Sequence, residues 1–167
     1  MIKQFSKIIK AMNSGVAPEQ IAGGAVLGMF CGFYMISPFN VVIIVMLLLV
    51  FNVNIPFFGL SLLFFKALSI AADPVADIMG YKILTAAPLA GIFTSLGDAP
   101  VIPLTMYNNT LVAGWTVIGV IIVLPVFIGV KRFVLFYRKN VQPSVEKYGI
   151  VKALKAGSFF RGKGGEK

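Results

Sequence analysis

The sequence predicts an all-α membrane protein with about four membrane segments, including a candidate re-entrant helical hairpin, and with amphipathic interfacial helices at the termini. Hydrophobic residues make up 58% of the chain and charged residues 13%, and the mean hydropathy is +0.91. This balance lies outside the usual range of soluble folds. In addition, long apolar runs alternate with turn residues, and the basic residues gather at the two ends. We therefore expect most of the chain to lie in a membrane.

Positive charge is concentrated outside the apolar block. The 167 residues include 15 Lys and Arg against 6 Asp and Glu, which gives a net charge of +9. Most of these cations lie in residues 3–10 and 131–167, and Lys66 and Lys82 are the two between. Because cytoplasmic flanks of membrane segments are enriched in Lys and Arg, both termini are predicted to be cytoplasmic, with an even number of crossings. Anchorage to anionic headgroups accounts for this charge, so no nucleic-acid partner is expected.

Two residue types that carry much protein chemistry are scarce. The chain has no histidine and a single cysteine, Cys31, which lies inside the first apolar run. Histidine-based metal sites, catalytic triads and an intrachain disulfide are therefore excluded. No catalytic residue, metal ligand or cofactor is expected, and the sequence favours a protein that is not an enzyme.

The charge pattern divides the chain into three regions. Residues 1–14 predict an amphipathic interfacial helix, because apolar residues recur three or four positions apart between lysines. A frayed, solvated N-terminus is the alternative. Residues 15–130 predict a polytopic helical membrane domain, and residues 131–167 predict a basic cytoplasmic tail.

The first apolar run, residues 21–37, carries a glycine repeat. Gly24, Gly28 and Gly32 recur at every fourth position, which places them on one face of a helix. Glycines at this spacing let another backbone approach closely, as in many pairs of membrane helices. These three glycines are the predicted helix-packing residues, and we expect their face to receive the transmembrane helix of a partner.

Residues 21–51 are apolar apart from Ser37-Pro38 and Asn40. One helix of this length would measure roughly 46 Å, whereas the hydrocarbon core is roughly 30 Å thick. A break at Ser37-Pro38 is therefore predicted. The second arm, at about 20 Å, is too short to cross unaided. The two arms form either a re-entrant hairpin or two tilted crossings that borrow flanking residues.

Residues 56–72 predict a spanning helix that contains Lys66. A lysine at membrane depth is a candidate lipid or ion contact, as the counter-ion of a lipid phosphate or of an aspartate; snorkelling to the headgroups is the alternative. Asp73-Pro74 predicts the start of a new helix, with Asp73 as its N-cap and Asp77 one turn later on the same face. The two carboxylates are candidate ion or proton contacts, or else serve as cap and as partner of the helix dipole.

The second half of the chain contains the clearest transmembrane segment. Residues 52–56 predict a turn because asparagine and proline gather there, and Asn108-Asn109-Thr110 is another turn signal. Residues 82–96 form a weakly amphipathic stretch that is too interrupted by proline and glycine to predict a crossing. Residues 111–130 carry no charge, with Trp115 near one end and basic residues just beyond the other, so they predict a membrane span.

A set of short motifs in the first half of the chain is distinctive as a group. They are Ala17-Pro18-Glu19-Gln20-Ile21-Ala22, Gly24, Leu27-Gly28, Gly32-Phe33, Pro38 and Asn54. Together they resemble the start of a bacterial family of small polytopic membrane proteins that is classed only as a domain of unknown function. Pro100, Pro103 and residues 108–110 resemble a version of that family from bacteria with outer membranes, often encoded beside one larger protein. The resemblance implies an inner-membrane location and a dedicated partner, and it implies no activity.

These observations lead us to expect a multi-pass, non-enzymatic subunit of the bacterial inner membrane with both termini in the cytoplasm. It would pack against and support a larger membrane-anchored or periplasmic envelope protein, with envelope lipid transport as one such role. Membrane lipids are expected partners, and a homo-oligomer is a candidate state. The alternative is a small homo-oligomeric transporter or channel, because interrupted helices at membrane depth form transporter sites; the lack of a detectable internal repeat weighs against it.

Overall fold

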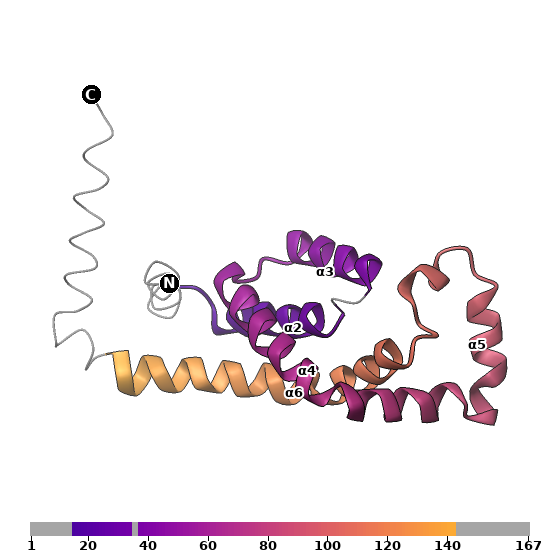
Figure 1. The fold of residues 1–167 in the computed structure, drawn as a ribbon. Helices are drawn as coiled ribbons and strands as arrows, with labels where there is room; N and C mark the ends of the chain where they lie inside the picture. The colour runs from indigo at the N-terminus through magenta and orange to yellow at the C-terminus, as the bar shows by residue number, and fades with distance from the viewer. Residues whose placement is uncertain (1–14, 35–36, 143–167) are drawn as a thin grey trace.

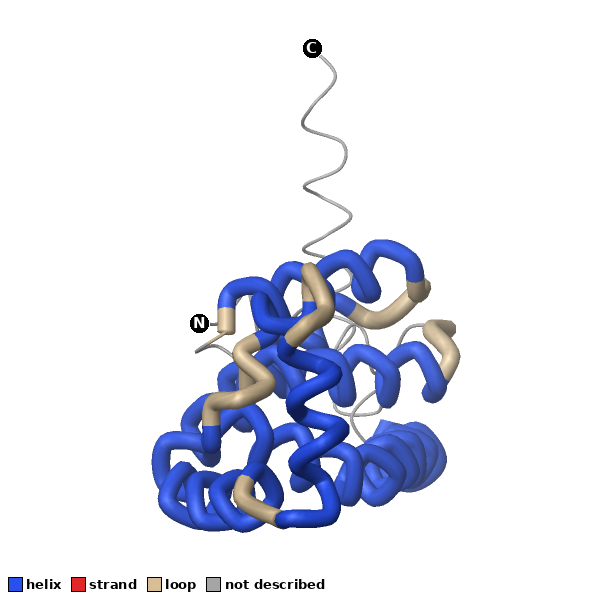
Figure 2. The backbone as a smooth tube through the Cα atoms, turned by 90° about the vertical axis from the view of Figure 1, so that its right-hand side faces the viewer, coloured by secondary structure: helices blue, strands red, loops and turns tan. Residues whose placement is uncertain are grey.

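A computed structural model describes residues 15–34 and 37–142, and every regular element in this part is helical (Figures 1 and 2). The predicted interfacial helix over residues 1–14 and most of the predicted tail lie outside the described residues. Two 3-10 turns flank the shortest α-helix, and a π-helical turn extends the last one. The elements are α2 (Pro18–Phe33), α3 (Pro38–Val50), α4 (Ile55–Leu84), η1 (Ala87–Leu89), α5 (Ala90–Gly97), η2 (Ile102–Thr105), α6 (Thr110–Phe136) and η3 (Tyr137–Val141).

α2, α4 and α6 pack together as the core of the fold (Figure 1). Successive glycines of α2 meet successive turns of α4, Gly24 at Asn54 and Gly32 at Leu62, so these two helices run parallel. α6 runs antiparallel to both, because its last turns pack with Ile21 at the start of α2. The start of α2, the start of α4 and the end of α6 therefore lie at the same end of the core.

The glycine face of α2 lies against α4. A Cβ atom added at Gly24 would lie 2.5 Å from the carbonyl oxygen of Asn54, and one added at Gly32 would lie 2.9 Å from the nearest backbone atoms of α4. Gly28 approaches the carbonyl oxygen of Phe58 so closely that a Cβ atom would clash. α4 of the same chain thus fills this face, in place of the partner's transmembrane helix that we expected there.

α2 and α3 form a helical hairpin. The break predicted at Ser37-Pro38 is confirmed, since α2 ends at Phe33 and α3 begins at Pro38. α3 returns the chain to the start of α2, where the Asn54 amide donates a hydrogen bond of 3.0 Å to the Gln20 carbonyl oxygen. With 16 and 13 residues, the arms measure about 24 and about 20 Å, less than the roughly 30 Å of a hydrocarbon core.

α4 is one helix of 30 residues, so the predicted start of a new helix at Asp73-Pro74 is wrong and Asp73 is not an N-cap. The cap is Asn54, whose side chain accepts a hydrogen bond of 3.1 Å from the Phe57 amide. Pro74 lies inside the helix, where a proline removes one backbone hydrogen bond and bends the axis. Accordingly, α4 changes direction about halfway along its length in Figure 1.

The chain between α4 and α6 consists of short helical pieces at the end of the core opposite to the start of α2. The interruption predicted for residues 82–96 is present, because α4 ends at Leu84 and α5 begins at Ala90. The Tyr107 hydroxyl donates a hydrogen bond of 3.0 Å to the Phe93 carbonyl oxygen, and the two rings stack with centroids 6.2 Å apart. This segment therefore folds back on itself beside α3.

α6 contains the predicted membrane span of residues 111–130 and extends it from Thr110 to Phe136. The helix begins within the predicted turn at 108–110, because the Asn109 side chain accepts a hydrogen bond of 3.2 Å from the Val112 amide. It continues past residue 130, the predicted end of the membrane domain, without a break. Trp115 is only 3% exposed and belongs to the core.

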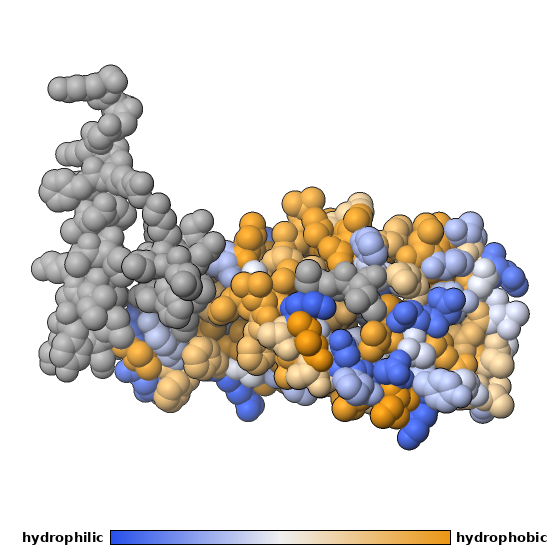
Figure 3. Space-filling view, viewed as in Figure 1, coloured by the Kyte–Doolittle hydropathy of each residue, from blue (hydrophilic) through white to orange (hydrophobic). Residues whose placement is uncertain are grey.

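Two helices are long and apolar enough to cross a membrane, α4 and α6 with its π-helical extension. Only 17% of the apolar stretch of α4 and 22% of that of α6 is buried within the chain, whereas the core helix of a soluble protein is mostly buried. α3 is more exposed still, with Leu49 at 79% and Val50 at 77%, and Figure 3 shows hydrophobic side chains over it. Of the about four predicted membrane segments, α2 and α3 are each too short to span unaided.

Candidate functional site

The Asp73 carboxylate lies where α4 faces α6. Its Oδ1 accepts a hydrogen bond of 2.8 Å from Nε1 of Trp115. The Trp115 ring stacks on Phe33 of α2, with ring centroids 4.2 Å apart. A buried indole N–H needs an acceptor, because an unpaired polar group in an apolar core is costly. Asp73 supplies that acceptor, and the contact joins α2, α4 and α6 at one point.

Asp77 lies one turn further along α4 and is exposed. Its Oδ1 accepts a hydrogen bond from the hydroxyl of Thr110, the first residue of α6. Each aspartate therefore binds a group of α6 rather than the other aspartate. In the described part of the chain, no group of three or more His, Cys, Asp or Glu residues could hold a metal ion.

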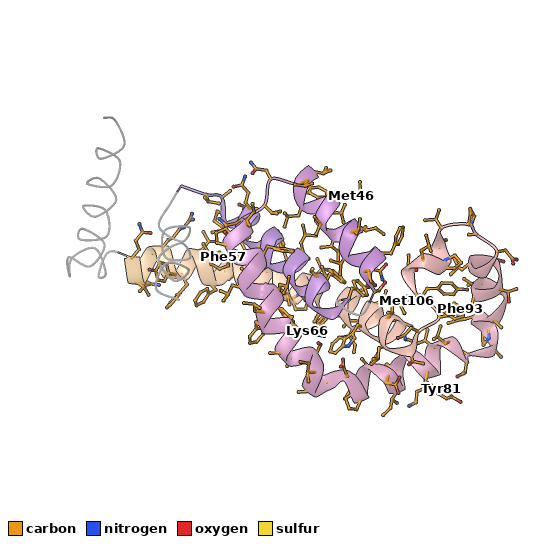
Figure 4. All side chains as sticks on the ribbon, turned by 45° about the horizontal axis from the view of Figure 1, so that its top comes forward. Met46, Phe57, Lys66, Tyr81, Phe93 and Met106 are labelled. Carbon is orange, nitrogen blue, oxygen red and sulfur yellow. The ribbon has the colours of Figure 1, made fainter. Side chains whose placement is uncertain are left out.

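Lys66 lies two turns before Asp73 on α4 and is half-buried. Helical spacing places Lys66, Asp73 and Asp77 on one face of α4. No ion pair joins Lys66 to either aspartate, although all three lie in the described residues. Figure 4 shows Lys66 on the middle of α4, and its backbone nitrogen lies against Gly32 near the end of α2. The structure thus gives Lys66 no aspartate partner and leaves the lipid contact as a proposal.

A second close helix contact, which we did not anticipate from the sequence, joins α4 to α6. Gly80 approaches the Thr110 carbonyl oxygen, and Gly114 approaches the Ala76 carbonyl oxygen, so closely that a Cβ atom fits at neither glycine. Ala76 and Gly80 are four positions apart, as are Thr110 and Gly114. This is the spacing of small residues that the glycine repeat of α2 also shows, so the sequence did contain the signal.

The two interrupted segments of the fold meet at Thr105, the last residue of η2. Its carbonyl oxygen accepts hydrogen bonds from Oγ of Ser37, at 3.1 Å, and from Nδ2 of Asn40, at 2.9 Å. Ser37 is fully buried and Asn40 is 9% exposed. The tip of the α2–α3 hairpin is thereby held against the segment between α5 and α6. The sequence signal was the presence of two polar residues within an apolar run.

A second polar contact connects the tip of the hairpin with α6. The hydroxyls of Tyr34 and Thr116 lie 2.8 Å apart. Thr116 donates its own proton to the Val112 carbonyl oxygen, at 2.6 Å, so Tyr34 is the donor between the two hydroxyls. The oxygen of Tyr34 therefore keeps its capacity to accept a hydrogen bond.

Tyr34, Asn40, Thr105 and Thr116 are among the residues that line a mainly apolar cavity of about 590 Å³, which is partly open to its surroundings. α2, α3 and α6 form its walls, and Phe93 and Tyr107 line the side toward α5. Figure 4 shows Phe93 and Met106 where α5 and the following turn approach the N-terminal end of α3. Among the described residues that line the cavity, none is charged. Its apolar lining residues include Leu27, Phe30, Ile44, Leu47, Ala113 and Val117.

Charged contacts gather at the opposite end of the core. Nζ of Lys131 lies 2.9 Å from Oε1 of Glu19, and Nη2 of Arg138 donates a hydrogen bond of 2.7 Å to the Val16 carbonyl oxygen. The hydrogen bond from Lys131 lowers the pKa of Glu19 from its ordinary value. Both contacts join the start of α2 to the end of α6.

One known protein is similar to this chain over most of its length. An uncharacterised protein of Treponema pallidum (strain Nichols) is 23% identical over 145 residues, which cover 87% of this chain and 90% of that protein. No family model matches the sequence, and no solved structure matches it. This distant similarity names no family and brings no activity with it.

Proposed function

We propose that this protein is a non-enzymatic, multi-pass subunit of the bacterial inner membrane and a member of the small polytopic family that its first half resembles. The observation that carries the proposal is the apolar surface of α4 and α6, most of which the chain leaves uncovered. Contiguous apolar surface of this extent is unfavourable in water and favourable in hydrocarbon. A lipid environment therefore explains both the hydrophobic composition of the chain and the exposure of apolar side chains on α4 and α6.

In the proposed topology, α4 and α6 cross the membrane in opposite directions, and the α2–α3 hairpin enters and leaves from the cytoplasmic side. The contacts of Lys131 with Glu19 and of Arg138 with Val16 support it, since they keep the two ends of the described chain together. The basic residues near both termini favour the cytoplasm for that shared end. The resulting number of crossings is even, as the charge pattern requires.

The proposed role is to pack against and support a larger membrane-anchored or periplasmic envelope protein, with envelope lipid transport as one setting. Because α4 fills the glycine face of α2, a partner would bind another surface. The outer face of α3 is accessible: Met46 is 61% exposed, whereas Met29 of α2 is fully buried. These two methionines give a matched pair of positions for cross-linking.

Cross-linking in native membranes tests this role. In a Cys31→Ala background, Met46→Cys should cross-link the tagged protein to one recurrent, larger companion, whereas Met29→Cys should not. Purification without cross-linker should recover the same companion. If the tagged protein leaves native membranes alone and monodisperse, the subunit role is wrong.

A transporter or channel is the second candidate, and the meeting of two interrupted segments at Thr105 favours it. Lys66, Asp73 and Asp77 would then line a path for an ion or a lipid headgroup. Neutralising each of them should abolish a flux reconstituted in liposomes, with Asp98→Asn in the exposed turn after α5 as the control. Unchanged flux in all three variants would exclude these residues from such a path.

A further inference from the structure

We infer that the cavity between α2, α3 and α6 is a binding site for an uncharged long-chain lipid, held through a hydroxyl or carbonyl group at one end of its apolar chain. The inference rests on the proposed membrane location and goes beyond the proposed subunit role. The observations behind it are the apolar walls, the lack of a charged residue among the described lining residues, and two polar lining side chains with unused hydrogen-bonding capacity.

The walls of the cavity define the class of ligand. A volume of about 590 Å³ lies within the usual range for small-molecule sites, roughly 300–1,000 Å³. Aliphatic and aromatic side chains from three helices make up most of the lining, and no charged residue of the described chain contributes. A charged headgroup would lose its hydration here without gaining a counter-charge. An uncharged lipid has no such cost.

Asn40 is one of the polar residues that line the cavity. The Asn40 residue is 9% exposed, and its Nδ2 donates to the Thr105 carbonyl oxygen. This bond fixes the orientation of the amide, so Oδ1 is left as an acceptor and Nδ2 keeps a second proton. Within the described residues, neither has a further hydrogen-bond partner. Buried amides usually satisfy more of their capacity than this, and a lipid hydroxyl or carbonyl would do so.

Tyr34, at the end of α2, provides a second acceptor in the lining of the cavity. Because its proton goes to Thr116, its oxygen can only accept from a ligand. A lipid hydroxyl can donate to Tyr34 or to Oδ1 of Asn40, and its oxygen or a neighbouring carbonyl can accept from Nδ2. The site therefore favours uncharged lipids such as diacylglycerols and isoprenoid alcohols, which share an apolar chain and a hydroxyl.

Photolabelling in liposomes tests the site. The probe is a diacylglycerol with a diazirine in one acyl chain, and the competitors are dioleoylglycerol, farnesol and dioleoylphosphatidic acid. Dioleoylphosphatidic acid carries the same chains as dioleoylglycerol plus a charged phosphate. We expect labelling of the cavity wall on α3 and α6, and at least fivefold stronger competition by dioleoylglycerol than by the phosphatidic acid. Competition by farnesol distinguishes an isoprenoid source from a glyceride source.

Two variants perturb the site in different ways. Asn40→Leu removes the amide but leaves the Ser37 hydroxyl bonded to the Thr105 carbonyl oxygen, and it should weaken competition by dioleoylglycerol about fivefold. Ala113→Trp fills the cavity and should abolish the competed labelling. Asn108→Leu is the matched control, because that asparagine is exposed and lies outside the cavity lining.

The outcomes separate the site from the proposed function. If the protein does not float with the liposomes, both the membrane location and the site are wrong. If it floats but labelling is spread over its apolar surface and is not competed, only the site is wrong. Equal competition by phosphatidic acid, or equal behaviour of Asn40→Leu and Asn108→Leu, would also overturn the site. Loss of competed labelling in Ala113→Trp, with Asn108→Leu unchanged, supports it.

Discussion

Gly28 and Gly59 lie in very different surroundings, although both are helical glycines. A Cβ atom at Gly28 would clash with the backbone of α4 at Phe58, whereas one at Gly59 would meet nothing within 4 Å. The first glycine is required by the contact between α2 and α4, and the second is not. Helix packing in a bilayer depends on such close approach, because lipid tails are as apolar as the side chains they replace.

Replacement of Gly28 by alanine should therefore separate α2 from α4. We expect Gly28→Ala to lower the free energy of unfolding by about 1–3 kcal/mol, the usual cost of an overpacked contact. Gly59→Ala should be neutral or slightly stabilising, because alanine is the better helix former. Unfolding in mixed micelles, with an increasing proportion of a denaturing detergent, measures the free energy of unfolding of both variants. Equal stability of the two variants would show that the close contact does not form.

Asp73 is the acceptor for a buried indole, and its charge is not needed for that purpose. Asp73→Asn keeps an acceptor oxygen and should change stability little. Asp73→Leu leaves Nε1 of Trp115 without its partner and should cost about 1–3 kcal/mol. The same unfolding assay distinguishes them. If Asp73→Asn is as destabilised as Asp73→Leu, the carboxylate charge has a role that the hydrogen bond does not explain.

At the scale of the elements, the sequence predicted the helices best where local chemistry decides. The turns at residues 52–56 and 108–110 were predicted from their asparagines, and Asn54 and Asn109 indeed cap α4 and α6. The span of residues 111–130 was predicted from its length and lack of charge. In each case the deciding groups lie within a few residues of the element that they define.

The errors arose where contacts distant in sequence decide. Asp73-Pro74 has the local chemistry of a helix start, yet α4 continues, because Asp73 and Ala76 on either side of Pro74 are held against α6. The bond from Asn40 to Thr105 joins residues 65 positions apart, so the sequence could mark Asn40 as a polar residue in an apolar run but could not indicate its partner. The cavity is lined by residues from both halves of the chain and was equally hidden from the sequence.

The contact between α2 and α6 predicts a dependence on pH. Lys131 lowers the pKa of Glu19 below its ordinary value of 4.5. A carboxylate with a lowered pKa in the folded state stabilises the protein above its unfolded pKa, and this contribution is lost as the pH falls through the folded pKa. Wild type should therefore lose more stability than Glu19→Gln as the pH falls from about 6 to about 3.

A variant of Lys131, the other member of the ion pair with Glu19, is the control for this prediction. Lys131→Met should show the same weakened pH dependence as Glu19→Gln, and added salt should reduce the difference from wild type, because Glu19 is largely exposed. Thermal unfolding in detergent at a series of pH values measures the effect. If the unfolding temperature falls with pH equally steeply in wild type and both variants, the ion pair does not form in solution.

At the scale of the whole molecule, the proposed topology requires the α2–α3 hairpin to enter and leave the membrane from one side. Its arms are short, and its tip is bonded to η2. In a Cys31→Ala background, Pro38→Cys at the tip should resist a membrane-impermeant maleimide added to the periplasmic side. Asn108→Cys, in the turn before α6, should react from that side. Periplasmic labelling of Pro38→Cys would favour the alternative of two tilted crossings.

The central claim is that α4 and α6 cross a membrane in opposite directions and bring the two ends of the described chain to its cytoplasmic side. The most direct measurement is labelling of Gly15→Cys and Lys139→Cys, one at each end, with an impermeant maleimide in right-side-out and inside-out vesicles. The account predicts that both cysteines react only in inside-out vesicles. Reaction of the two ends from opposite sides, or recovery of the protein in the soluble fraction without detergent, would contradict it.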